Sequence, residues 1–141
     1  MRRRLPMPLI IIITVLACLS PLAFFLPAIS GDSKYVINND SIILNGPYSR
    51  AIPFSQIEKI EYNSPLPKIS YRSNGISIGR INIGHFKSKG GGEVMLYLHS
   101  GKPTAIYVLT KDNKKVYINF KDENYADRFI NDLKNSCHLG N

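Results

Sequence analysis

Hydrophobic and polar positions follow three successive patterns along this chain: an unbroken apolar run, a series of short β-type segments, and a final segment with helical spacing. The apolar run covers residues 5–30, which contain no charged side chain and directly follow Arg2–Arg4. A helix needs about 20 apolar residues to cross the hydrocarbon core of a bilayer. The run therefore predicts a single uncleaved transmembrane anchor in the cell membrane. Basic residues before it predict a cytoplasmic N-terminus and a C-terminal domain on the extracytoplasmic side.

Two other interpretations of the apolar run stay open. A cleavable signal peptide has an apolar centre of about 7–15 residues, shorter than this run, and a small-residue cleavage site, which Ala28–Ser30 could supply. A lipoprotein signal is the other, because Val15–Cys18 resembles a lipobox, with a bulky Leu16 where a small residue is usual. Otherwise Cys18 is a small apolar residue within a membrane helix.

Strand patterns dominate after a short linker at residues 31–33. The segments with the clearest β character are Tyr35–Ile37, Ile42–Leu44, Val94–Leu98, Ala105–Leu109 and Val116–Phe120. The last three recur about every eleven residues, a spacing that indicates an antiparallel meander.

The middle of the chain changes phase. Ile76 and Ile78 share one face of a strand, and Ile81 and Ile83 share a face that is out of register by one residue. A slip of one residue exchanges the two faces of a strand. We therefore predict a bulge or tight bend at Gly79–Arg80, where glycine permits unusual dihedral angles.

A helix closes the chain. Asp122 is the predicted N-cap, because its side chain can accept a hydrogen bond from the first turn. Apolar residues recur at helical spacing at Tyr125, Ala126, Phe129, Ile130 and Leu133. This amphipathic helix is expected to cover a sheet or the mouth of a barrel.

Candidate chemistry is sparse. His85, His99 and His138 are too scattered for a metal site or an activated nucleophile, and Cys18 and Cys137 have no partner at metal-ligand spacing. We expect His99 and His138 to be exposed to solvent, and His85 to hydrogen-bond within a loop. No catalytic residue, metal or cofactor is predicted.

The glycines and the paired acids also give no sign of a catalytic or phosphate-binding site. No helix follows Gly75, Gly79 or Gly84 as a phosphate loop would require, so we interpret them as turn or bulge glycines. Glu58 and Glu61 have polar neighbours and are expected to face solvent.

Charge adds one candidate site. The chain has 18 Lys and Arg against 10 Asp and Glu, a formal net charge of +8, which is too evenly spread for a nucleic-acid partner. Arg72, Arg80, Lys87 and Lys89 lie in a stretch without acids between Glu61 and Glu93. If this stretch is a hairpin or a long loop, these four cations would project together. They would then bind an anion or a lipid headgroup, unless they simply solvate a basic loop.

The element order suggests a family. About seven short strands followed by one amphipathic helix is the order of a pleckstrin-homology (PH) fold. The segments that resemble landmarks of the bacterial PH-like domain family are Arg50–Ile57, Pro65–Ile69, Arg72–Gly75, Gly84–Phe86, Ala105–Leu109 and Tyr117–Phe120. The resemblance covers residues 34–136. It implies a mainly β (α+β) fold, an antiparallel barrel or sandwich of about seven strands capped by a C-terminal helix. The apolar run predicts one transmembrane helix before this fold.

The expected organisation is an anchor at residues 1–30, a linker at 31–33, a PH-like domain at 34–136 and a tail at 137–141. The resemblance brings no functional residues, and the paired basic residues of phosphate-binding PH domains are absent from the first hairpin. We therefore expect a membrane-anchored, non-enzymatic module that binds a protein or a membrane surface. Binding of lipid headgroups or other anions is the alternative, and a small envelope enzyme is less favoured.

Overall fold

The computed structural model describes residues 6–137, without the side chains of residues 22–30 and Cys137. The chain divides between Gly31 and Asp32 into two compact units. The first contains helix α1, Met7–Ser30, which begins with a proline in its first turn, where the missing N–H costs little. Among the residues that the structure describes, no helix has the length and apolar character needed to cross a membrane.

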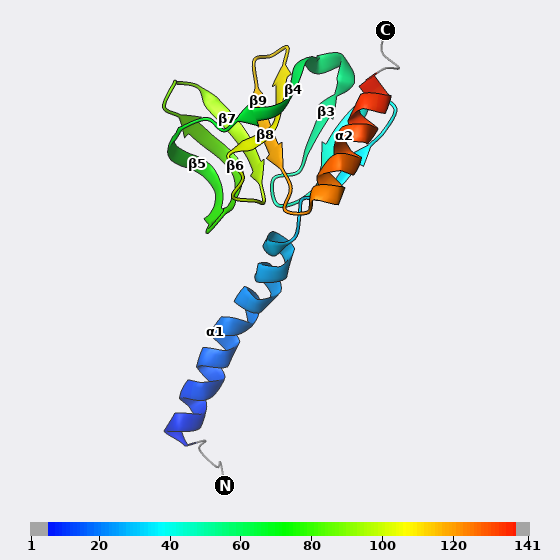
Figure 1. The fold of residues 1–141 in the computed structure, drawn as a ribbon. Coiled ribbons are helices and arrows are strands. Elements are labelled where there is room, and N and C mark those ends of the chain that lie inside the picture. Colours follow the sequence, from blue (N-terminus) through cyan, green and yellow to red (C-terminus); the bar gives the residue numbers. More distant parts are fainter. Residues whose placement is uncertain (1–5, 138–141) are drawn as a thin grey trace. The chain divides into compact units, whose positions relative to one another are not determined.

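The second unit is a sandwich of two β-sheets with one helix (Figure 1). Its elements are β1 Tyr35–Ile37, β2 Ser41–Leu44, β3 Arg50–Pro53, a 3-10 turn at Phe54–Gln56, β4 Ile57–Pro65, β5 Ile69–Ile78, β6 Ile81–Ser88, β7 Glu93–Leu98, β8 Thr104–Thr110, β9 Lys115–Asn119 and α2 Glu123–Cys137. The small sheet has the order β1-β2-β3, and the large sheet has the order β4-β8-β9-β7-β6-β5. The described residues thus form nine strands where the sequence predicted about seven, because the hairpin β5–β6 contains two long strands.

The predicted meander of β7, β8 and β9 is wrong. β9 pairs with β8 in the antiparallel sense but with β7 in the parallel sense, so β8 lies on the far side of β9 from β7. The side-chain oxygen of Asn119 accepts hydrogen bonds from the backbone N–H groups of His99 (2.9 Å) and Ser100 (3.0 Å). These bonds fasten the loop after β7 to the end of β9.

The main core lies between the two sheets and α2, and its largest fully buried side chains are Tyr97, Phe120 and Phe129. The predicted N-cap is confirmed, since Asp122 Oδ1 accepts a hydrogen bond from the Tyr125 N–H at 3.2 Å. The predicted apolar face of α2 is also confirmed, because its five residues are buried or half-buried and belong to or pack against this core.

The hairpin β5–β6 confirms one glycine prediction and corrects two. Gly79 lies in the tight turn before Ile81, with φ +58°, as predicted. Gly75 and Gly84, interpreted from the sequence as turn or bulge glycines, instead lie opposite each other inside the two strands. The two backbones approach so closely there that neither position has room for a side chain.

Two histidine predictions are also wrong. His99 is 6% exposed rather than solvated, because Ser33 contacts its ring and donates a backbone N–H to Nε2 at 3.2 Å. His85 does form a side-chain hydrogen bond, with Glu93, but it lies in strand β6 rather than in a loop. His138 lies outside the described residues.

Candidate functional site

The four cations singled out from the sequence lie on one hairpin, as expected, but they do not gather at one place. Arg80 is in the turn between β5 and β6, whereas Lys87 and Lys89 are near the other end of β6. The eight residues of β6 lie between Arg80 and Lys89, so the two are about 30 Å apart at roughly 3.3 Å per residue step. Arg72 lies on β5 opposite Phe86, one residue from Lys87 and so near the same end of the hairpin as Lys87 and Lys89. The structure therefore divides these charges between the two ends of the hairpin, with Arg80 apart from the other three. A function for them in binding anions or lipids stays a prediction.

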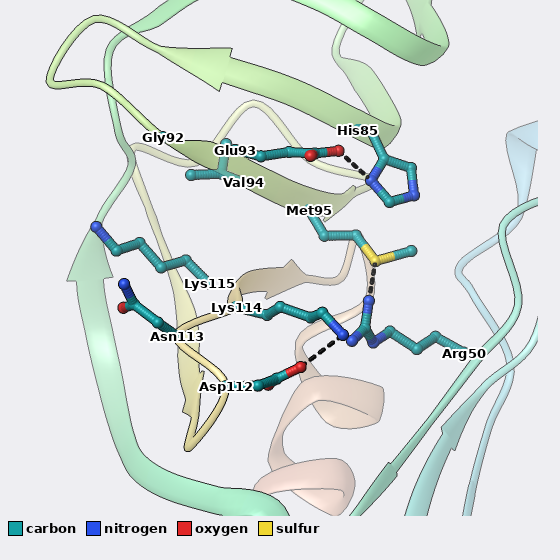
Figure 2. Close-up of a pocket in the computed structure, with 10 residues that line it drawn as sticks. All are labelled: Arg50, His85, Gly92, Glu93, Val94, Met95, Asp112, Asn113, Lys114 and Lys115. Carbon is teal, nitrogen blue, oxygen red and sulfur yellow. Dashed lines mark hydrogen bonds and ion pairs between the residues drawn. The ribbon is translucent and has the colours of Figure 1, made fainter.

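A different group of charged residues surrounds a cavity of about 320 Å³. The cavity lies between the start of β3, the β6–β7 turn and the β8–β9 turn (Figure 2). The charged or titratable residues that line it are Arg50, His85, Glu93, Asp112, Lys114 and Lys115. Figure 2 shows Arg50 and Lys114 reaching toward the same space from different elements. We name this cavity the loop-end pocket.

Arg50 is the distinctive residue of the loop-end pocket. It is half-buried at the start of β3, opposite Leu44 of β2. Its Nη1 donates a hydrogen bond to Met95 Sδ at 3.5 Å, and a thioether is only a weak acceptor. Within residues 6–137, no carboxylate forms a salt bridge with this guanidinium. A guanidinium has five N–H donors, so Arg50 keeps most of its donors available to a ligand.

The acids of the pocket already have partners. Glu93 Oε1 lies 2.6 Å from His85 Nδ1, and Asp112 Oδ2 lies 2.5 Å from Lys114 Nζ. The hydrogen bond from Lys114, followed by that from the Thr110 hydroxyl, holds the pKa of Asp112 below its usual range. Asp112 therefore stays ionised beside Lys114 at neutral pH. The pocket can still attract an anion, because Arg50 remains without a carboxylate partner.

Local backbone geometry holds the lysines in place. Asn113 adopts a left-handed conformation (φ 61°) in the β8–β9 turn, a conformation that asparagine tolerates better than most residues. The Thr110 N–H donates to the Lys114 carbonyl at 3.0 Å, and the Lys114 N–H donates to Thr110 Oγ1 at 3.1 Å. This closed turn presents Lys114 and Lys115 at the edge of the pocket.

Sequence reasoning missed this site because its residues come from three distant segments. Arg50 entered only as part of a family landmark, and no local motif joins it to the β8–β9 turn. The one usable signal was the Asp112–Lys114 segment, whose composition marked a turn. No three His, Cys, Asp or Glu residues in the described part of the chain are placed to share a metal ion.

Comparison with known proteins places the chain among bacterial sequences. Residues 33–136 match the family described as bacterial PH domain. The chain is also similar to an uncharacterized protein of Rickettsia typhi, with 34% identity over 101 residues. That match covers 66% of this chain and 11% of the relative, so the chain spans only a small part of the relative's length. No solved structure matches the chain.

Proposed function

Because the chain belongs to the bacterial PH domain family, as its sequence landmarks predicted, we propose that it is a membrane-anchored, non-enzymatic binding module. Its ligand site is the loop-end pocket, which takes an anionic group such as a carboxylate or a phosphate. The observation that carries this proposal is the half-buried Arg50 guanidinium, whose hydrogen-bond partner is a thioether. Arginine presents its donors in a planar fork that matches both kinds of anion.

The electrostatics of the pocket favour binding over catalysis. A general base must be within reach of the proton that it removes and must carry a suitable pKa. Glu93 is paired with His85, and Asp112 is held ionised by Lys114 and Thr110, so both acids already serve the structure. The pocket therefore carries out no proton transfer in this proposal, and its cations attract the anionic ligand.

Replacement of Arg50 by glutamine should weaken anion binding strongly. A hydrogen bond to a charged group contributes about 1.5–3 kcal/mol, so R50Q should raise the Kd for inorganic phosphate by roughly 10-fold or more. The measurement is an NMR titration of residues 32–141 with sodium phosphate at constant ionic strength, monitored at the amides of Met95 and Lys115.

The matched control is Lys111→Gln, which removes one positive charge from the β8–β9 turn at a residue that does not line the pocket. This variant should keep the wild-type affinity. Equal losses in both variants would indicate general charge attraction, and an unchanged affinity in R50Q would remove the proposed site.

The membrane anchor rests on the composition of α1. Residues 5–30 lack charge, and the large apolar side chains described on the helix between Met7 and Leu19 are 39–79% exposed. A helix that is apolar on all sides needs an apolar environment. We propose that the bilayer provides it, with the N-terminus in the cytoplasm and the domain on the extracytoplasmic side.

Cell fractionation should recover the full-length chain in the membrane pellet after an alkaline carbonate wash, whereas residues 32–141 expressed alone should remain in the supernatant. Mass spectrometry of the pelleted protein should show a chain that keeps residues 1–30 and carries no lipid on Cys18. A mature chain that begins after Ser30 would support signal cleavage instead, and a lipidated Cys18 would support the lipoprotein alternative.

A further inference from the structure

Strand β5 leaves one long edge of the large sheet open. It is the last strand in the order β4-β8-β9-β7-β6-β5, and within the described residues it pairs only with β6 over its ten residues. Most of its side chains are exposed, including two large ones, Tyr71 (57%) and Ile78 (52%). A long exposed edge of this kind presents unpaired backbone donors and acceptors to any other extended chain.

The opposite edge of the same sheet is protected. Strand β4 carries Glu58, Lys59 and Glu61, and it ends at Pro65. Asn63 adopts a left-handed conformation (φ 57°) within the stretch where the pairing of β4 with β8 shifts register. Charges, prolines and irregular backbone are the usual devices that stop edge-to-edge pairing. By contrast, β5 has one charged residue, Arg72, and no proline. Its pairing with β6 shifts register between Ile69 and Asn74 but is regular from Asn74 to the turn.

The hairpin turn shows which backbone groups of β5 face outward. Ile78 and Ile81 flank the two-residue turn and form the last pair of the ladder. The pair next to such a turn exchanges hydrogen bonds, and antiparallel pairs alternate between bonded and non-bonded. Ser77 therefore lies in a non-bonded pair with Asn82, so its N–H and C=O groups point to the open edge.

Charge along the hairpin defines the partner. Residues 62–92 contain no acid, and their cations are Lys68, Arg72, Arg80, Lys87 and Lys89. Lys68, Arg72, Lys87 and Lys89 lie toward the end of the hairpin away from its turn, and Arg80 lies in the turn. Cations at both ends of the edge would repel a second copy of β5 and attract an acidic strand. The five cations thus argue for an acidic partner and against self-association.

Apolar surface beside the edge defines the partner further. A groove of about 370 Å³ is lined by Arg72 and Ile69 of β5 together with buried Phe86, Leu96 and Leu98. Tyr71 and Ile78 add exposed apolar surface along the same strand. A strand that places acidic and apolar side chains in alternation would meet both features, because alternate residues of a strand face opposite sides.

We infer that β5 is a docking edge for an extended acidic segment of another protein, which adds one strand to the large sheet. This inference rests on the proposed function as a binding module and adds a partner class, but it uses a surface separate from the loop-end pocket. Backbone hydrogen bonds along β5 supply affinity, and the cations select the partner.

The test uses residues 32–141, which contain both sheets, α2 and both hydrophobic clusters and so carry a complete core. The probes are three capped eight-residue peptides: alternating glutamate and valine, the same peptide with proline for valine, and the same peptide with lysine for glutamate. The glutamate–valine peptide should slow hydrogen exchange at the Ser77 amide by roughly 10-fold or more, and the other two should not. Equal binding of the proline peptide would show attraction by charge alone and overturn the inference, as would the absence of protection at Ser77.

Three variants locate the binding. Arg72→Glu should lower the affinity for the glutamate–valine peptide by about 10-fold or more. Lys111→Glu, an equal charge reversal away from the hairpin, should leave that affinity unchanged. Arg50→Gln should leave protection at Ser77 intact even though it weakens phosphate binding. Loss of protection in R50Q would assign the peptide to the loop-end pocket and overturn the docking edge, while failure of phosphate binding alone would leave the docking edge standing.

Discussion

Truncation of Phe129 to alanine should lower the free energy of unfolding of the β domain by about 3–5 kcal/mol, the range for large-to-alanine changes in a core. Phe129 is 0% exposed on the inner face of α2. The centroid of its ring lies 4.6 Å from the ring centroid of Tyr35 in the small sheet and 5.2 Å from that of Phe120, just after β9. One side chain thus joins the helix to both sheets. Domains of this size are stable by only about 5–15 kcal/mol, so the variant should lose a large fraction of its total stability.

Urea unfolding of residues 32–141 followed by circular dichroism measures this effect. Asn131→Ala is the matched control, because Asn131 lies on the exposed face of the same helix. Alanine is the better helix former, so the control should match or slightly exceed the wild-type stability. A Phe129→Ala midpoint equal to that of the wild type would mean that α2 does not belong to the core.

The elements that sequence reasoning predicted well are those encoded by neighbouring residues. The α2 face was predictable because Tyr125, Phe129 and Leu133 recur at helical spacing, and the cap at Asp122 lies immediately before the helix. The tight turn at Gly79–Arg80 was predictable because the hydrophobic phase changes across it. Each of these features depends on contacts within about four residues along the chain.

Strand pairing was not predictable in the same way. The spacing of β7, β8 and β9 is that of a meander, yet the loop from His99 to Pro103 carries the chain past the end of β9. The bonds from Asn119 that hold this loop connect residues about twenty positions apart. A sequence period reports the faces of a strand but does not report its neighbours.

For the candidate sites too, distance along the sequence did not predict distance in space. Arg80 is close in sequence to Arg72 and Lys87, but extended strands separate it from both of them in space. Arg50 and Lys114 are far apart in sequence, yet they line one pocket. Likewise, His99 was expected in solvent, yet it is buried and its ring contacts Ser33, which precedes it by 66 residues. Polar residues of this kind are recruited by tertiary contacts that local composition does not reveal.

Replacement of Gly84 by alanine should produce the second large loss of stability, at least about 2 kcal/mol. Gly84 has φ +116°, a conformation that costs other residues about 1–3 kcal/mol. A Cβ atom there would lie 2.6 Å from the Asn74 carbonyl oxygen and 2.6 Å from the Gly75 Cα. Both obstacles are backbone atoms of β5, so relief requires separation of β5 from β6.

Gly90→Ala is the matched control for this prediction, because Gly90 has no left-handed φ and a Cβ atom added there would have no neighbouring atom within 4 Å. Gly90→Ala should change the unfolding free energy by no more than about 0.5 kcal/mol, as surface substitutions usually do. Urea unfolding measures both variants, and hydrogen exchange should show that Gly84→Ala speeds exchange first at the β5 amides. Gly84 allows β5, the docking edge, to pack closely against β6, so the same variant should also weaken binding of the glutamate–valine peptide. Wild-type stability in Gly84→Ala would instead mean that β5 and β6 do not approach this closely, and the geometry assigned to the Ser77 edge would fail with it.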